Sequence, residues 1–445
     1  MIDAGASIVE GRVLPLTAGS LVLALLEKLS EDRVPWVYLR NYEQLPESVG
    51  NDVDLLVPFG QRWKVALLLT AEAERLGWRC LGHGNFSPIA LYFCHLPSAG
   101  TVHLDIFDRL EWHCLEYAEA AEILRDCKWN GLVNIPEGRD EVYLNVVTRL
   151  LYQGEIRTKH RSQALSFPGG LEGLREGFQR HLGPRGSEVV NALDRTGWVA
   201  DRRVRRRILI EAILRYGLKK PLRLIRGLAR YGRRVIGKLL KPPGRFMVLE
   251  GADGVGKSTV LEEIIPWCKT WCGGREAYRF HWKPVRVSRG VSEGAGPVDP
   301  RGRPLRSRAA SFIYLTWHLA GFWWGYFRRV RPLLAKSHAV VGDRYSYDIF
   351  LDPRRFRLRL PDVVCRWAAL LAPKPDLVVA LLADPEEIHR RKSELSDLEI
   401  SDYQARWKTV AKGRKFMRDI PADDSPAETV QRVKRVMLET FSTRP

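Results

Sequence analysis

The sequence predicts an α/β chain. A C-terminal domain with a parallel sheet and helices on both faces follows an α+β domain and a basic helical connector. The chain has 445 residues, of which 45% are hydrophobic and 28% charged, a composition typical of two or three globular domains. Strand and helix patterns alternate in both halves. Charge is uneven: between residues 202 and 241, fifteen Lys or Arg residues stand against the single acid Glu211, so this stretch carries +14 of the net +19.

The first predicted domain covers residues 1–155 and mixes helices with strands. Apolar periodicity predicts helices over residues 18–29, 63–76 and 140–153, and strands over residues 34–40, 52–57, 89–95 and 101–107. Residues 156–200 continue in a helical pattern with Gly and Pro breaks. We therefore expect an α+β domain with a helical extension.

The connector is predicted over residues 201–243. Its aliphatic residues, among them Leu222, Ile225 and Ile236, recur at three- and four-residue spacing with arginines between them, and the pattern stops at Pro242-Pro243-Gly244. Three interpretations remain open: an interdomain helix whose apolar stripe docks on the protein, a helix on an anionic membrane surface, or a nucleic-acid-binding segment, for which arginine density alone is a weak argument.

A phosphate-binding loop opens the domain predicted over residues 244–445. The apolar strand at residues 246–249 is followed by a G-x-x-x-x-G-K-S sequence and an amphipathic helix. Glycines let backbone N–H groups turn toward phosphates, the lysine contacts the β- and γ-phosphates and the serine hydroxyl binds Mg²⁺. The predicted cofactors are therefore ATP and Mg²⁺, and the predicted nucleotide-binding residues are Gly251, Asp253, Gly254, Gly256, Lys257, Ser258 and Thr259.

Later motifs make this domain similar to the thymidylate kinases, a family of P-loop kinases. A strand ends in Asp343-Arg344-Tyr345, a core strand covers residues 375–382, and Arg390-Arg391-Lys392 opens a lid-like segment. The loop at residues 420–426 resembles the one beside the adenine. The resemblance covers residues 245–445.

The resemblance implies roles for particular residues. Asp343 would help to hold Mg²⁺ or orient the acceptor, Arg344 would grip the acceptor phosphate, and Asp253 would face the acceptor sugar. Arg390 and Arg391, with Lys257, would neutralise charge on the transferring phosphoryl group. The resemblance further implies ATP and a small phosphate-accepting substrate as partners, and a homodimer.

The acceptor half of the family pattern differs in this sequence. Phe280-His281-Trp282-Lys283-Pro284 stands where thymidylate kinases carry Arg-Glu-Pro-Gly-Gly. The uncharged aromatic stretch at residues 309–327 is diluted by polar residues, which favours a buried or groove-lining helix over a membrane span. Side chains from this region could line a different acceptor site or pack in the core: Trp317, Trp323, Trp324, Arg328 and Arg331.

Three aspartates mark a second candidate site in the N-terminal domain. Asp52 and Asp54 lie one residue apart at the head of a predicted strand and so point the same way, and Asp105 lies on another strand. Such carboxylates can bind Mg²⁺ for nucleotidyl transfer. The region around residues 30–110 resembles the nucleotidyltransferase superfamily, but its Gly-Ser pair is absent near residues 39–42, where Arg40 is a candidate substitute.

The leading functional prediction is ATP-dependent phosphoryl transfer to a nucleoside monophosphate or a similar small acceptor. Two alternatives stay open: a bifunctional kinase and nucleotidyltransferase acting on a sugar or lipid-linked intermediate, and a non-catalytic nucleotide-binding switch. Seven scattered cysteines and an N-terminus without a secretory pattern predict a cytoplasmic protein. The basic connector allows for a peripheral position on the inner face of the membrane.

Overall fold

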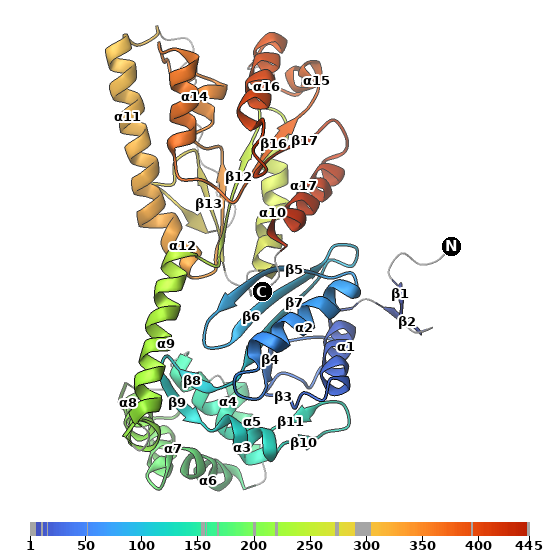
Figure 1. The fold of residues 1–445 in the computed structure, drawn as a ribbon, viewed down its shortest axis with the longest axis vertical. Helices are drawn as coiled ribbons and strands as arrows, with labels where there is room; N and C mark the ends of the chain where they lie inside the picture. Colours follow the sequence, from blue (N-terminus) through green and yellow to red (C-terminus); the bar gives the residue numbers. More distant parts are fainter. Residues whose placement is uncertain are drawn as a thin grey trace. The chain divides into compact units, whose positions relative to one another are not determined.

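The computed structural model divides into two compact units, one within Met1–Gly237 and one within Lys238–Ser442 (Figure 1). It describes residues 6–9, 12–15, 17–50, 52–152, 156, 158–166, 169–198, 202–218, 221–271, 276–289, 304–392 and 395–442. Among the helices of these residues, none combines the length and the hydropathy that crossing a membrane requires.

The first unit is built around a five-stranded sheet in the order β3-β4-β7-β6-β5. The strands are β3 Val37–Tyr38, β4 Val53–Leu56, β5 Arg79–Asn85, β6 Ile89–His95 and β7 Gly100–Phe107. β4 and β7 are parallel and the other pairs antiparallel. Helices α1 Ala18–Glu31 and α2 Arg62–Arg75 bury Leu25 and Leu69 in the core beneath this sheet. The predicted mixture of helices and strands is confirmed, although the polar strand β5 was not predicted.

A second core in this unit is mostly helical. It joins Tyr143, Phe178 and Val190 to Ile208. The helices are α3 Ala120–Arg125, α4 Gly138–Tyr152, α5 Thr158–Ser166, α6 Gly170–Leu182, α7 Gly186–Arg195, α8 Arg202–Ala212, the π-helical turn η1 Ile213–Leu218 and α9 Pro221–Leu240. Short hairpins complete the unit: β1 Ala6–Val9 with β2 Arg12–Pro15, β8 Leu110–Trp112 with β9 Leu115–Ala118, and β10 Lys128–Trp129 with β11 Asn134–Ile135.

Helix α9 forms the second half of the predicted connector. Its periodicity predicted a helix, which the structure confirms, whereas its aliphatic stripe does not dock on the first unit. Leu222, Ile225 and Ile236 are exposed. The helix instead contacts the β8–β9 hairpin through Gly227 and Tyr231 on another side.

The second unit carries a six-stranded sheet in the order β14-β13-β15-β12-β16-β17. Its strands are β12 Arg245–Glu250, β13 Ala277–His281, β14 Ser288–Arg289, β15 Ala339–Asp343, β16 Leu377–Leu382 and β17 Met417–Pro421. All neighbouring strands are parallel except β14, which runs antiparallel to β13. The predicted α/β class is therefore confirmed.

Helices cover both faces of this sheet (Figure 1). They are α10 Lys257–Trp271, α11 Arg308–Gly325, the turn η2 Tyr326–Val330, α12 Arg331–Ala335, α13 Asp348–Leu351, α14 Asp362–Leu371, α15 Pro385–Arg391, α16 Asp397–Ala411 and α17 Pro426–Phe441. α10 and α17 lie on one face, α11 and α14 on the other. α11 buries Leu315 and Phe322, whereas Trp317 and Trp324 on its other side are exposed, so only half of this helix is buried as predicted.

Candidate functional site

The predicted phosphate-binding loop lies between β12 and α10, in the strand–loop–helix context that the sequence predicted. Gly254 and Gly256 have φ values of 95° and 101°, which side-chain-bearing residues rarely adopt. The Gly251 N–H donates to the Tyr403 hydroxyl at 3.1 Å, which fixes the start of the loop. α10 begins at Lys257, and because the first N–H groups of a helix lack intrahelical acceptors, they point into the loop as anion-binding donors.

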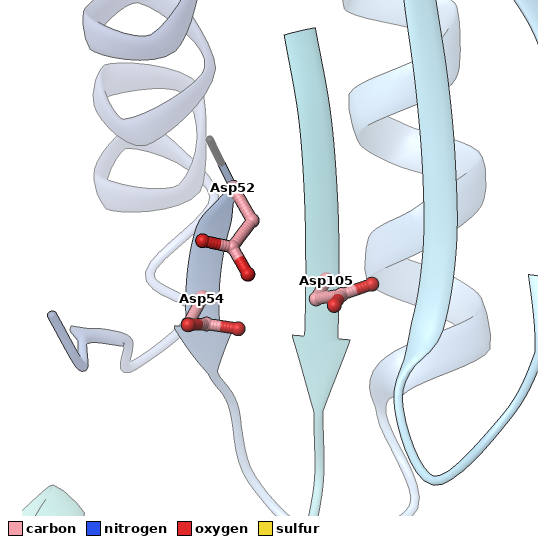
Figure 2. A group of neighbouring side chains, drawn as sticks. All are labelled: Asp52, Asp54 and Asp105. Atoms are coloured by element: carbon pink, nitrogen blue, oxygen red, sulfur yellow. The ribbon is translucent and has the colours of Figure 1, made fainter. Parts of the chain in front are cut away.

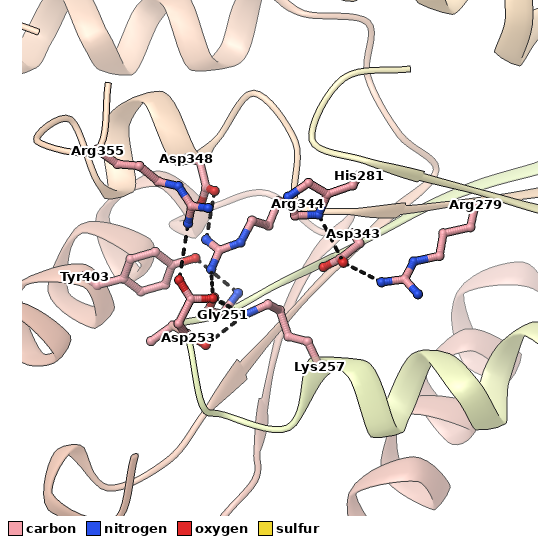
Figure 3. A network of polar contacts seen from close by, with 11 residues as sticks. Gly251, Asp253, Lys257, Arg279, His281, Asp343, Arg344, Asp348, Arg355 and Tyr403 are labelled. Carbon is pink, nitrogen blue, oxygen red and sulfur yellow. Dashed lines mark hydrogen bonds and ion pairs between the residues drawn. The ribbon is translucent and has the colours of Figure 1, made fainter. Parts of the chain in front are cut away.

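Lys257 lies over this loop (Figure 3). Its ammonium donates to the carbonyl oxygens of Gly251 and Ala252, each at 2.7 Å, and lies 3.8 Å from Asp253. Burial, reinforced by the charge of Arg344, lowers the pKa of Lys257 to about 8. An anion bound in the loop would favour the charged lysine.

Asp343 ends β15 next to the loop strand. Its Oδ2 accepts hydrogen bonds from Arg279 Nη2 at 2.6 Å and from His281 Nδ1 at 3.2 Å, both on the neighbouring strand β13 (Figure 3). Burial opposes ionisation, but the hydrogen bonds from His281 and Arg279 and the charge of Lys257 outweigh it and hold the pKa of Asp343 below its usual range. Asp343 is therefore a carboxylate with one oxygen engaged.

Arg344 is the centre of a buried ion-pair network. It donates from Nη1 to Asp348 at 2.9 Å and from Nη2 to Asp253, which also pairs with Arg355 at 3.3 Å. Its backbone has φ 68°, an unfavourable conformation for a residue other than glycine that is often found at functional sites. Its own side chain is 4% exposed. The guanidinium is thus positioned at the cavity by two carboxylates.

These groups share one cavity of about 1600 Å³. Its wall also includes Phe280, His281 and Trp282, so the segment that departs from the family pattern does line the site. Seven basic side chains stand against three acidic ones: Lys257, Arg279, Lys283, Arg286, Arg329, Arg344 and Lys392 against Asp253, Glu262 and Asp343. Such a wall suits an occupant with several negative charges.

The remaining predicted residues lie elsewhere. Arg390 and Arg391 both pair with Glu387 on α15, at 2.6 and 2.9 Å, and neither lines the cavity, whereas the next residue, Lys392, does. The five residues suggested for an altered acceptor site, Trp317, Trp323, Trp324, Arg328 and Arg331, are not among the lining residues either. From that region, Arg329 reaches the cavity instead.

Sequence reasoning missed Arg279, Arg286 and Arg329, and it named Lys283 and Lys392 only as members of the altered acceptor segment and the lid-like segment. One signal was present for Arg279: it alternates with His281 at the end of a strand, so both side chains point the same way. The carboxyl ends of parallel strands meet at one edge of the sheet, and Asp343 ends the adjacent strand.

The three N-terminal aspartates converge as predicted (Figure 2). Asp54 and Asp105 are register partners on β4 and β7, and one carboxylate oxygen from each of Asp52, Asp54 and Asp105 lies within 4.8 Å of the others. Arg40 bonds Asp54 and lies 3.9 Å from Asp52. Burial raises the pKa of Asp54 to about 6, with Arg40 opposing the shift and Asp52 adding to it.

Two further contacts complete this cluster. Asn41 Nδ2 donates to Asp52 at 3.1 Å, and His103 Nε2 lies 3.1 Å from Asp105. Three carboxylates with one permanently charged arginine leave an excess of negative charge. The donor set is therefore all-oxygen and anionic, the kind that Mg²⁺ prefers.

Comparison with known proteins points to one family. No family model matches the chain. A thymidylate kinase of Jannaschia sp. (strain CCS1) is 32% identical over 154 residues, 32% of this chain and 66% of that protein. Thymidylate kinases of Chromohalobacter salexigens and Prochlorococcus marinus are 32% and 30% identical over 108 and 109 residues, covering 23% of this chain each and 46% and 47% of those proteins. The chain thus spans less than two thirds of the length of these curated relatives.

Two thymidylate kinases are among the solved structures that also match. The thymidylate kinase from Candida albicans has a TM-score of 0.32 at 17% identity, over 44% of this chain and 93% of that one. The enzyme from Ehrlichia chaffeensis has a TM-score of 0.31 at 15% identity, over 44% of this chain and all of that one. The sequence matches establish a thymidylate kinase-like region in this chain.

Proposed function

We propose that residues 244–445 transfer the γ-phosphoryl group of ATP to a small acceptor, a nucleoside monophosphate or a molecule of similar size and charge. The observation that carries this proposal is that the phosphate-binding loop, Lys257, Asp343 and a strongly basic wall surround a single cavity. The similarity to thymidylate kinases at 30–32% identity supports it.

The residues present fit ATP with Mg²⁺. The loop and the first turn of α10 offer N–H groups to the phosphates. The Ser258 hydroxyl lines the cavity, and Asp343 Oδ1 accepts no hydrogen bond within the described part of the chain. Both are hard oxygen ligands of the kind that hold Mg²⁺ beside a nucleotide. Bound Mg²⁺ would neutralise phosphate charge, while Lys257 contacts the β- and γ-phosphates.

Positive charge around the cavity would position the reacting groups. Arg344, held by Asp253 and Asp348, has a fixed direction and is suited to an acceptor phosphate. Lys392 already lines the cavity beside the loop. Arg390 and Arg391 precede it directly and would approach the phosphoryl group only after the segment rearranges, as lids of phosphotransferases do.

The part of the cavity wall near Trp282, which we assign to the acceptor, differs in chemistry from the phosphate-binding loop, which we assign to ATP. Trp282 stacks on Phe356 with ring centroids 5.0 Å apart, and the Lys283 ammonium lies 4.7 Å from the Trp282 ring. Lys283, Arg286 and Arg329 add positive charge to the same wall. This combination favours an acceptor that carries both an anionic group and a flat or apolar part.

ADP release by the purified full chain tests the proposal. With ATP, Mg²⁺ and a panel of nucleoside monophosphates, sugars and sugar phosphates, we expect one acceptor class to stimulate ADP release. Lys257→Ala should lower that rate by about 10²- to 10³-fold, whereas Lys408→Ala, at an exposed surface lysine, should not. ATP binding that no acceptor converts into ADP release would favour the nucleotide-binding switch.

The aspartate cluster supports a second candidate function, nucleotidyl transfer by residues 1–155. The convergence of Asp52, Asp54 and Asp105 on adjacent strands favours it. Incorporation of label from α-³²P-labelled nucleoside triphosphates into a sugar phosphate or lipid-linked acceptor would measure it. Asp54→Asn should abolish incorporation while Lys257→Ala preserves it; if neither changes it, the cluster has no part in the transfer.

A further inference from the structure

Helix α9 is attached to its unit by its charged side. Glu111 on β8 is buried, 3% exposed, and its carboxylate accepts from Arg230 Nη2 at 3.2 Å and from Arg234 Nη2 at 2.7 Å. Arg234 also donates to the carbonyl oxygens of Phe86 and His113, both at 2.8 Å. A buried carboxylate with two guanidinium partners is costly to break, so this contact fixes the rotation of the helix about its axis.

Close packing on the same side supports that orientation. A Cβ at Gly227 would come within 2.8 Å of the Cys114 carbonyl oxygen, so only glycine lets the helix approach the hairpin this closely. Tyr231 packs edge-on against His113, and Arg223 pairs with Glu119 at 3.1 Å. The polar and small residues of α9 therefore face the protein.

The opposite side of α9 is an aliphatic stripe that the described residues of the first unit leave exposed. Leu222, Ile225, Leu228 and Ile236 are 66%, 60%, 53% and 58% exposed. Their three- and four-residue spacing places them along one face. Because the rotation of the helix is fixed, the stripe cannot turn inward, and exposing this many aliphatic groups to water is unfavourable unless a partner buries them.

The charges around the stripe indicate which class of partner would bind it. Arg226 and Arg233 lie at its margin, are exposed and form no ion pair within the described residues. Residues 202–241 contain fifteen basic residues and one acid. A second copy docking through this face would bring two such stretches together, which like-charge repulsion disfavours. Nucleic acid would satisfy the arginines but would leave the aliphatic groups in water.

We propose that α9 is a docking surface for an anionic lipid bilayer. The helix lies in the plane of the interface, with its aliphatic stripe among the acyl chains and Arg226 and Arg233 beside the lipid phosphates. This proposal is independent of the kinase cavity, because no residue of α9 lines it.

Co-sedimentation of the full chain with vesicles tests the proposal. We expect binding to vesicles of phosphatidylcholine with 30 mol% phosphatidylglycerol, weaker binding to phosphatidylcholine alone, and weakening with added salt. Arg226→Gln with Arg233→Gln should lower the partition coefficient about thirty-fold. This figure is the free energy of two lost arginine contacts with the anionic surface, converted at about 1.4 kcal/mol for each tenfold change. Ile225→Gln with Ile236→Gln should lower it by about tenfold or more.

Matched control variants test whether vesicle binding depends on the α9 surface itself or only on the protein's net charge and its exposed apolar residues. Lys408→Gln with Arg435→Gln removes the same net charge from exposed positions elsewhere, and Leu67→Gln with Leu398→Gln removes two other exposed leucines. Both should bind vesicles like the wild type. Circular dichroism spectra should show that all variants are folded.

Three results would overturn the proposal. One is equal partition of all variants into anionic vesicles, and another is no partition of the wild type. The third is a concentration-dependent dimer, seen by light scattering without lipid, that Ile225→Gln with Ile236→Gln dissolves; it would make a second copy the occupant of the stripe.

Discussion

Arg279 donates a hydrogen bond to Asp343 at 2.6 Å between two adjacent parallel strands, β13 and β15. Both side chains are largely buried, with 12% and 10% of their surface exposed. The arginine therefore holds the carboxylate in one orientation at the edge of the cavity. Asp343 Oδ2 faces Arg279 and His281, which leaves Oδ1 without a hydrogen bond among the described residues.

Replacing Arg279 by glutamine should impair both folding and catalysis. The loss of one charge-assisted hydrogen bond should lower the free energy of unfolding by about 1.5–3 kcal/mol. An Asp343 with looser orientation should lower kcat/KM by about tenfold or more. Urea denaturation and ADP-release kinetics would measure the two effects. Arg289→Gln, at an exposed arginine on β14, is the control, and an unchanged kcat/KM for Arg279→Gln would contradict the assigned role.

The donor half of the site could be predicted because it is local in sequence. The loop from Gly251 to Thr259 is one continuous motif whose residue spacing determines its backbone shape. Arg279, Lys283 and Arg329 could not be predicted in the same way, because they reach the cavity only through the strand order β13-β15-β12 and the packing of η2. A sequence pattern does not specify which strands become neighbours.

The direction in which side chains point from a helix explains two other differences between the prediction and the structure. The lid segment was predicted from Arg390-Arg391-Lys392, but the turn of α15 directs both arginines to Glu387 and leaves Lys392 next to the loop. The stripe of α9 was visible as a periodicity, yet which side docks depends on Glu111, more than a hundred residues away. For the aspartate cluster, strand alternation predicted that Asp52 and Asp54 share a face, and the parallel pairing of β4 with β7 brings Asp105 beside Asp54.

Glu250 and Asp348 should respond in opposite ways to amide substitution. Burial, with the nearby charge of Asp348, raises the pKa of Glu250 well above its usual range, which favours the neutral carboxyl in the folded protein. Glu250→Gln keeps its shape and should not lower stability. Asp348→Asn removes a partner of the buried Arg344 and should lower the free energy of unfolding by about 3–5 kcal/mol.

The effect of Glu250→Gln on stability should depend on pH. A carboxyl whose folded pKa is raised makes the folded state bind more protons than the unfolded state, so stability falls as pH rises past the unfolded pKa of about 4.3. Relative to the wild type, Glu250→Gln should therefore gain stability over the pH range that begins at about 4.3 and extends upward. Chemical denaturation at several pH values would measure this gain. A constant difference across that range would mean that Glu250 is ionised in the folded protein.

Lys283 should make acceptor binding depend on pH. Burial lowers its pKa to about 8, so its charge is present below that pH and lost above it. The KM of an anionic acceptor should rise by roughly tenfold from pH 7 to pH 9, because one charge-assisted contact is lost. Lys283→Arg keeps the charge and should flatten the profile. If the profile of Lys283→Arg follows that of the wild type, another group titrates, and the KM of ATP would then show whether it is Lys257.

Removing divalent metal should destabilise the first unit if Asp52, Asp54 and Asp105 hold a cation. A ligand at one hundred times its dissociation constant adds about 2.7 kcal/mol to folding, so Mn²⁺ or Mg²⁺ without nucleotide should raise the thermal midpoint and EDTA should reverse the rise. Asp54→Asn should abolish the effect, whereas Asp343→Asn in the other unit should keep it. Arg40 already pairs with Asp54. If the wild type shows no metal response, the cluster binds no cation under these conditions, and the role of its ion pair is structural.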